Sequence, residues 1–160
     1  MPSVLEKLRA GVTTASADET RALATEFAAT LPPDATLALH GNLGVGKTTF
    51  VQGLARGLGV TDAVTSPTFT IFTLHRALRS PAQRDEVGRA PFTLVHLDAY
   101  RLERADQLDP LMLEDFLVTP YCLAIEWPDN IAAWLPPDTL HLDLGIAPDE
   151  KHTLRLRATV

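Results

Sequence analysis

The fold expected for this chain is decided by the stretch Gly41-Asn42-Leu43-Gly44-Val45-Gly46-Lys47-Thr48. It matches the pattern G-x4-G-K-[ST], in which glycines let the backbone approach an anion and consecutive N–H groups surround phosphate oxygens. In this pattern the lysine reaches the β- and γ-phosphates, and the threonine hydroxyl coordinates Mg²⁺. The alternative interpretation is a glycine-rich turn that merely joins a strand to a helix.

The segments on either side of the loop have the character that a phosphate-binding loop requires. Thr36 to His40 is a short apolar run, typical of a buried strand, and Lys47 to Leu58 has a helical pattern that ends near Gly57 and Gly59. A helix that starts near Gly46 points its positive end at the same phosphates. The sequence therefore predicts a strand, a phosphate-binding loop and a helix in succession.

Toward the N-terminus, one strand and one helix are expected. Leu8 to Thr14 alternates roughly between apolar and polar residues, which favours a strand. Ser16-x-x-Glu19 is a capping-box pattern and predicts the start of an amphipathic helix. Pro32-Pro33 is expected to end that helix.

Toward the C-terminus, apolar runs alternate with helical patterns. The expected elements are β-rich Phe69 to Leu74, apolar strands Phe92 to Leu97 and Tyr121 to Ile125, a helix interrupted by Pro110 from Ala105 to Leu117, a helical turn from Ile131 to Leu135, and two late strands, Leu140 to Leu144 and Thr153 to Val160. The late strands alternate well and are joined by an acidic turn, which predicts an antiparallel hairpin. Residues 75–91 exceed the usual loop limit of about 12–15 residues and are expected to be a loop insertion.

This order of elements predicts an α/β fold of the P-loop NTPase type: a central, mostly parallel sheet flanked by helices, with a C-terminal antiparallel hairpin. The length of 160 residues predicts a single domain, 1–160. The single cysteine, Cys122, excludes an internal disulfide. A net charge of −6 argues against direct binding of nucleic acid. With neither a membrane span nor a signal peptide visible, we expect a cytoplasmic protein.

Two acidic residues end predicted strands and are candidates for the Mg²⁺ site. Asp98 follows Leu94-Val95-His96-Leu97, and Glu126 follows Leu123-Ala124-Ile125. Ligands bind at the carboxyl ends of parallel strands, so both carboxylates are expected near the loop, and the pattern alone does not rank them. His96 has no second histidine at ligand spacing, which favours a hydrogen-bonded sheet histidine over a metal ligand.

The nucleotide is expected to be ATP. The chain has no Asn-Lys-x-Asp stretch of the kind that gives GTPases their guanine specificity. The sequence from Asp98 to Arg101 also lacks the Asp-x-x-Gly switch. ATP is therefore favoured over GTP, and a Ras-like switch is disfavoured.

Four motifs in order resemble those of the TsaE (YjeE) family of small bacterial ATPases. They are Gly41 to Thr49, Ser66-Pro67-Thr68-Phe69-Thr70, His96-Leu97-Asp98-Ala99-Tyr100-Arg101 and Glu126-Trp127, and the resemblance covers about residues 16 to 144. Two departures are visible: Asn42 stands where the family usually has an acid, and the 75–91 stretch is longer than the family loop.

The resemblance implies roles for particular residues. The nucleotide would be bound by Gly41, Asn42, Leu43, Gly44, Val45, Gly46, Lys47, Thr48 and Thr49, with Gly44 to Thr49 at its phosphates. Thr48 and Glu126 would hold Mg²⁺, and Lys47, Asp98 and Glu126 would serve hydrolysis. Ser66 to Thr70 would be a switch-like segment near the γ-phosphate. Trp127 would lie beside the metal ligand, and Ala17, Thr20 and Lys151 would approach the nucleotide base.

The resemblance also implies a function. Family members hydrolyse ATP and act with TsaD and TsaB in threonylcarbamoyladenosine modification of tRNA next to the anticodon, resetting that complex between turnovers. Few arginines lie near the loop of this chain, so its hydrolysis is expected to be slow until a partner docks. The partners would then be proteins, with tRNA met only through the complex, and the cofactors would be ATP and Mg²⁺. Two alternatives remain open: a small-molecule kinase that uses 75–91 as its lid, and an interaction module that binds ATP without hydrolysing it.

Overall fold

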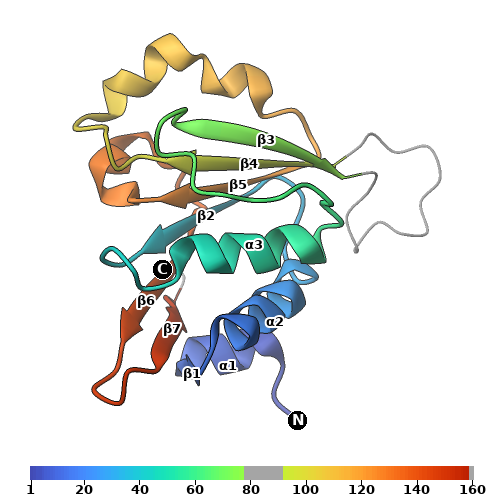
Figure 1. Cartoon of the computed structure of the whole chain (residues 1–160). Helices are drawn as coiled ribbons and strands as arrows, with labels where there is room; N and C mark the ends of the chain where they lie inside the picture. Colours follow the sequence, from blue (N-terminus) through green and yellow to red (C-terminus); the bar gives the residue numbers. More distant parts are fainter. Residues whose placement is uncertain (78–91, 159–160) are drawn as a thin grey trace, which may run out of the picture.

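The computed structural model describes residues 1–77 and 92–158, and within them seven strands form one mixed sheet (Figure 1). The order of the strands across the sheet is β1-β7-β6-β2-β5-β4-β3. Their bounds are β1 Val12–Thr14, β2 Ala35–His40, β3 Phe72–Ala77, β4 Phe92–Asp98, β5 Tyr121–Glu126, β6 Leu140–Ile146 and β7 His152–Leu156.

The centre of the sheet is parallel and its edges are antiparallel. β2 pairs in parallel with both β5 and β6, and β5 pairs in parallel with β4. β3 runs antiparallel to β4 at one edge, and β7 runs antiparallel to β6 and β1 at the other. The expected α/β architecture with a C-terminal antiparallel hairpin is confirmed. β7 ends at Leu156, earlier than expected, and residues 159–160 lie outside the described part of the chain.

The α-helices cover one face of the sheet (Figure 1): α1 Val4–Ala10, α2 Ala17–Ala28 and α3 Lys47–Gly57. Their apolar side chains form one core with β2, β5 and β6, and the rings of Phe27 and Phe50 lie 5.9 Å apart between α2 and α3. Gly53 and Gly57 allow the two helices to approach closely, because a Cβ on either would lie within 2.8 Å of atoms of α2. Packing in this core therefore holds α3 in a fixed position against the sheet.

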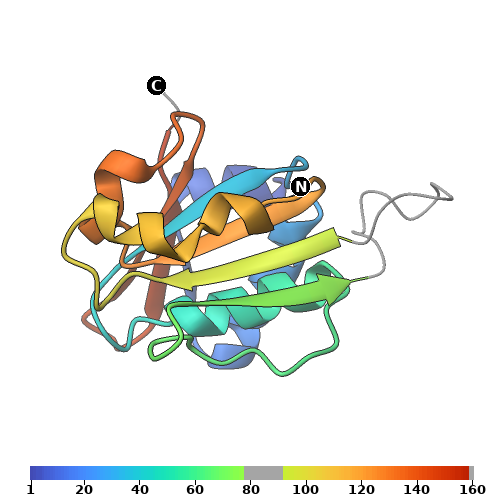
Figure 2. The same ribbon diagram turned by 90° about the horizontal axis from the view of Figure 1, so that it is seen from above.

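The opposite face is covered by 3-10 helices, η2 Ala105–Leu111, η3 Leu113–Phe116 and η4 Pro128–Trp134, which cross above the strands in Figure 2. A second apolar core lies here, between these segments and the odd-numbered residues of β4 and β5. The expected helical segment from Ala105 to Leu117 is present as two 3-10 helices, and the interruption falls at Met112 rather than at Pro110. Pro110 has no N–H to donate, and Met112 adopts a left-handed conformation with φ 50°, so the segment breaks into two short 3-10 helices.

The N-terminus also differs from expectation. Leu8 lies in α1 and only Val12–Thr14 form a strand. Ser3 and Glu6 form a reciprocal capping box that starts α1, and Gly11 ends it with φ 95°. The pattern Ser3-x-x-Glu6 would have predicted this helix. The pattern Ser16-x-x-Glu19 correctly predicted the start of α2, because the Ser16 side chain accepts from the Glu19 amide, although the Glu19 carboxylate accepts from the Ala15 amide instead of closing a capping box. α2 ends at Ala28, before the two prolines.

The segment before β3 is a turn rather than the expected strand. The Ile71 amide donates to the Pro67 carbonyl at 2.7 Å, and Ile71 has φ 70°, so the strand starts only at Phe72. β3 in turn continues to Ala77, three residues into the expected insertion, because its backbone pairs with β4. The remainder of the expected insertion, residues 78–91, lies outside the described residues.

Candidate nucleotide-binding site

The glycine-rich loop joins the carboxyl end of β2 to the start of α3, as the pattern predicted. Gly46 precedes α3 with φ 101°, in the left-handed region that glycine tolerates. Gly41 has φ 148°, and a Cβ there would lie 2.6 Å from the Leu144 carbonyl oxygen. No side chain caps α3, so its first amide groups point into the loop, where they can bind an anion.

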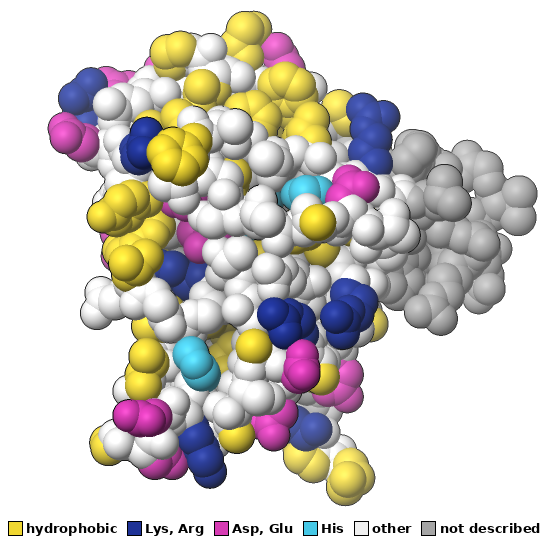
Figure 3. All heavy atoms as spheres, in the orientation of Figure 1, with side chains coloured by type: hydrophobic (Ala, Val, Ile, Leu, Met, Phe, Trp, Pro, Cys, Tyr) yellow, Lys and Arg dark blue, Asp and Glu magenta, His cyan; other side chains and the backbone are white. Residues whose placement is uncertain are grey.

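A cavity of about 610 Å³ opens beside this loop, within the range typical of small-molecule sites. In Figure 3 acidic and basic side chains meet in a hollow on the face that carries α3, with hydrophobic side chains beside it. The cavity is lined by Leu43, Gly44, Gly46, Lys47, Thr48, Thr49, Ser66, Thr68, Asp98, Tyr100, Glu126, Trp127 and His152.

Thr48 and Glu126 meet across the cavity, from the first turn of α3 and the last residue of β5. The Thr48 hydroxyl donates to the two carboxylate oxygens of Glu126 at 2.9 and 3.2 Å. β5 pairs with β2, so its end lies directly beside the loop. A hydroxyl and a carboxylate oxygen are both ligands that Mg²⁺ accepts, so this pair can hold the ion.

Lys47 is largely buried and lies at the bottom of the cavity. Its ammonium group donates to the Gly41 carbonyl and lies 3.5 Å from the centroid of the Trp127 ring. Burial lowers the pKa of Lys47, and the negative charges of Glu126 and Asp98 oppose that shift. These two carboxylates thus favour the charged ammonium form, the form that binds phosphate.

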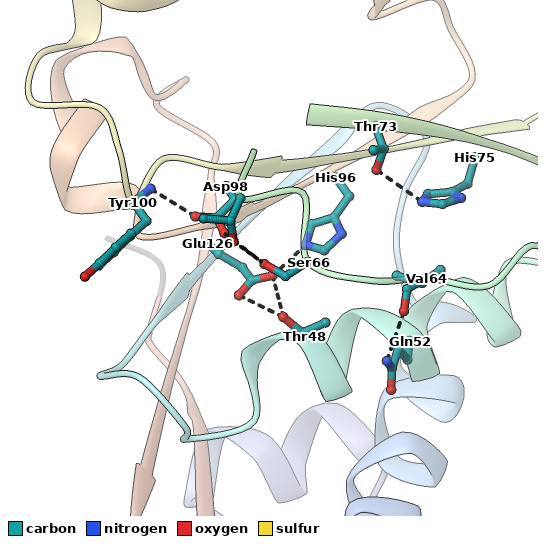
Figure 4. Close-up of polar contacts among 11 residues, drawn as sticks. Thr48, Gln52, Val64, Ser66, Thr73, His75, His96, Asp98, Tyr100 and Glu126 are labelled. Carbon is teal, nitrogen blue, oxygen red and sulfur yellow. Dashed lines mark hydrogen bonds and ion pairs between the residues drawn. The ribbon is translucent and has the colours of Figure 1, made fainter. Parts of the chain in front are cut away.

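Asp98 ends β4 directly beside Glu126, to which it is paired in the sheet register. One carboxylate oxygen accepts hydrogen bonds from the hydroxyls of Ser66 and Thr68, each at 3.0 Å, and the other accepts from the Tyr100 amide at 2.9 Å (Figure 4). These hydrogen bonds therefore hold the segment that contains Ser66 and Thr68 against the edge of the site.

His96 is fully buried beneath the site, and its Nε2 lies 2.6 Å from Glu126 Oε2. The interpretation of His96 as a hydrogen-bonded sheet histidine is right for this nitrogen. Its Nδ1, however, has no hydrogen-bond partner among the described residues. Only the pairing of β4 with β5 brings His96 to Glu126.

Aromatic residues and one histidine stand at the mouth of the cavity. The rings of Tyr100 and Trp127 lie 5.0 Å apart, and Trp127 has a left-handed φ of 57°. His152, at the start of β7, lies with Nδ1 2.8 Å from the Val45 carbonyl oxygen. His152 was not singled out in the sequence, because only the fold of the C-terminal hairpin brings it to the loop.

Three residues expected near the nucleotide base are not among those that line the cavity. Thr20 is buried, and its hydroxyl lies 2.6 Å from that of Thr14. Ala17 is exposed at the start of α2. Lys151 is half exposed on the turn before β7, 4.0 Å from Asp149.

A lysine and a threonine at the start of α3, held opposite carboxylates at the ends of β4 and β5, place the chain in the class of nucleotide-binding P-loop proteins. The model of a family described as "Threonylcarbamoyl adenosine biosynthesis protein TsaE" matches residues 14–155. The chain belongs to the TsaE family.

Relatives and a solved structure agree with this assignment. A tRNA threonylcarbamoyladenosine biosynthesis protein TsaE from Bacillus subtilis is 34% identical over 91% of this chain and 83% of its own length. A protein of the same name from Treponema pallidum is 32% identical over 84% of this chain and 90% of its own length. The crystal structure of Bacillus subtilis YdiB superposes with a TM-score of 0.68 at 33% identity, covering 94% of this chain and 85% of that one.

Proposed function

We propose that this protein binds and hydrolyses ATP with Mg²⁺ and serves the threonylcarbamoyladenosine modification of tRNA next to the anticodon. The observation that carries the proposal is the hydrogen bond between Thr48 and Glu126 at the mouth of the phosphate-binding loop. The names of the relatives support the pathway.

The described residues suggest how the reaction would proceed. The loop amides and the Lys47 ammonium would bind the β- and γ-phosphates, and Thr48 and Glu126 would hold Mg²⁺. The ion would neutralise charge that develops on the phosphates. Asp98 lies beside Glu126 at the same edge of the sheet, where its carboxylate would organise the water or the metal for hydrolysis.

We further propose that protein partners of the TsaD and TsaB type complete the function, in the cytoplasm, and that tRNA is met through their complex. Lys47 is the one lysine or arginine among the described residues that line the cavity. Transition-state charge would then be only partly compensated by this chain alone, so hydrolysis would be slow until a partner docks. The net charge of −6 also suits a protein that binds protein partners directly and contacts RNA only through them. Among the described residues, no helix is long and apolar enough to cross a membrane.

The test is ATP hydrolysis by the protein alone and after addition of TsaB and TsaD, with Thr48→Ala as the control. We expect weak hydrolysis alone, a clear rise with partners, and loss of both in the variant, because the variant lacks the hydroxyl that would bind Mg²⁺. Hydrolysis that ignores the partners, or none in either condition, would contradict the proposal. Transfer of phosphate from ATP to a metabolite would instead support the kinase.

A further inference from the structure

His96 occupies a buried position that ordinary core packing does not explain. Its side chain is fully buried in the middle of β4, on the sheet face that α3 covers. An apolar residue there would cost nothing in unmade hydrogen bonds, whereas His96 leaves its Nδ1 without a partner among the described residues. The hydrogen bond that it does make goes to Glu126, the residue at the candidate Mg²⁺ site.

The carboxylate partner identifies which nitrogen of the His96 ring is the donor. A carboxylate accepts hydrogen bonds, so the proton of the 2.6 Å contact belongs on His96 Nε2. With this proton on Nε2 the ring donates to Glu126, and Nδ1 makes no hydrogen bond among the described residues.

The Glu126 carboxylate is held from two sides. The Oε2 atom accepts from His96 Nε2 and from the Thr48 hydroxyl, while Oε1 accepts from Thr48 alone among the described residues. His96 comes from the neighbouring strand and is itself locked in the core, so it fixes the carboxylate against rotation (Figure 4). Residues that orient a metal ligand in this way commonly change metal affinity by 10- to 100-fold when they are replaced.

We infer that His96 is a positioning residue: its Nε2–H holds the Glu126 carboxylate in the orientation that, together with Thr48, receives Mg²⁺. The inference rests on the proposed function, because it assumes the Mg²⁺–nucleotide site. It assigns His96 no contact with the ion or the nucleotide. Its role is to act through Glu126.

The first test compares His96→Leu, His96→Gln and His96→Asn. The Gln amide can place a donor where Nε2 stands, whereas the shorter Asn amide reaches only the place of Nδ1. A non-hydrolysable ATP analogue is titrated calorimetrically with Mg²⁺ and with EDTA. We expect the Mg²⁺-dependent gain in affinity to fall about 10–100-fold in the Leu and Asn variants and to stay within about 3-fold of wild type in the Gln variant. Affinity in EDTA should stay nearly constant throughout.

The matched control is His75→Leu. His75 is a second buried histidine on the same face of the sheet. Its Nδ1 makes no hydrogen bond among the described residues and lies 3.5 Å from an Asp62 carboxylate oxygen, while its Nε2 lies 3.2 Å from the Thr73 hydroxyl and makes no contact with Glu126. If His96 had only a structural role, its replacement would leave the Mg²⁺-dependent gain in affinity unchanged, as we expect for the replacement of His75. We expect this variant to keep the full Mg²⁺-dependent gain even where it lowers the melting temperature.

A second readout uses the protein without nucleotide or metal. A long-range ¹H–¹⁵N spectrum of the histidine rings should show His96 with a proton on Nε2, and Glu126→Gln should shift that resonance. Failure of wild type to bind the analogue more tightly with Mg²⁺ would overturn the proposed function and the role of His96 with it. A wild type that does respond, with equal responses from the Gln and Asn variants or a ring with no proton on Nε2, would overturn the inference about His96 alone.

Discussion

Asp98 uses both of its carboxylate oxygens, one for the hydroxyls of Ser66 and Thr68 and the other for the Tyr100 amide. A carboxylate that accepts three hydrogen bonds is held in one orientation at the edge of the site. The two hydroxyls can rotate to accept as well as donate, so an amide of the same shape can replace the carboxylate without disrupting the turn. The substitution Asp98→Asn therefore removes the negative charge while it keeps the shape of the side chain.

For Asp98→Asn we expect ATP hydrolysis to fall about 100-fold or more, because the group proposed to organise water or metal loses its charge. Affinity for the nucleotide should change only about 3-fold, because the phosphate-binding loop is untouched. Steady-state hydrolysis and calorimetry measure the two quantities. The control is Asp106→Asn, an exposed acid paired with Arg104. Full activity of Asp98→Asn in hydrolysis and in a reconstituted tRNA modification assay would show that Asp98 has another role.

At the scale of elements, the position of α3 decides where Lys47 and Thr48 stand. α3 packs closely against α2 at Gly53, where a Cβ would lie 2.7 Å from the Cα of Arg21 and 2.8 Å from the Cβ of Ala24. The Arg21 atom in this contact belongs to the backbone, and backbone atoms move aside less easily than the end of a flexible side chain. The two helices and the site at the start of α3 therefore form one packed unit.

Gly53→Ala tests this packing. Alanine gains about 1 kcal/mol in helix propensity, but overpacking commonly costs about 1–3 kcal/mol. Because the clash is with backbone, we expect a net loss of stability of at least ~1 kcal/mol, measured by urea unfolding. Arg56→Ala, at an exposed position of the same helix, should stay within about 0.5 kcal/mol of wild type. A stabilised Gly53→Ala variant would mean that α2 moves away freely.

At the scale of the whole molecule, the sheet separates two apolar cores, one beneath the α-helices and one beneath the 3-10 helices. Cys122 lies on β5, in the middle of the sheet, and belongs to the first core. Burial raises the pKa of the Cys122 thiol from 9.0 to about 12. Its thiol thus reports on the integrity of the whole fold, since only unfolding exposes it to water.

This shift predicts a dependence of stability on pH. Between pH 9 and pH 12 the folded protein keeps the proton of Cys122 while the unfolded chain loses it, so the contribution is complete below pH 9 and is lost as the pH rises. From pH 8 to pH 10 wild type should lose about 1.4 kcal/mol more unfolding free energy than Cys122→Ala. Urea unfolding of both proteins at the two pH values gives the difference. Parallel losses in the two proteins would mean that the thiol titrates in the folded state.

Elements whose conformation depends mainly on neighbouring residues were predicted correctly from the sequence. The glycine-rich loop, the strand before it and the helix after it follow from neighbouring residues, and so does the alternating C-terminal hairpin. The N-terminal helix was missed although the capping pattern of Ser3 and Glu6 was present. The segment around Pro110 keeps only short 3-10 turns, because apolar packing against the sheet holds a backbone that proline bars from a regular α-helix.

The chemistry of the loop follows from the order of its residues, because glycines, lysine and threonine that are contiguous in the chain lie together in any fold. The arrangement of the acids around the loop was decided only by the tertiary structure. Asp98 and Glu126 end similar apolar strands, but β5 rather than β4 pairs with β2, so the carboxylate of Glu126 meets the hydroxyl of Thr48. The pairing of β4 with β5 places His96 behind Glu126. The C-terminal hairpin, whose strand β6 pairs with β2, brings His152 to the loop. Such contacts depend on strand order, which non-local pairing sets and which no short stretch of residues encodes.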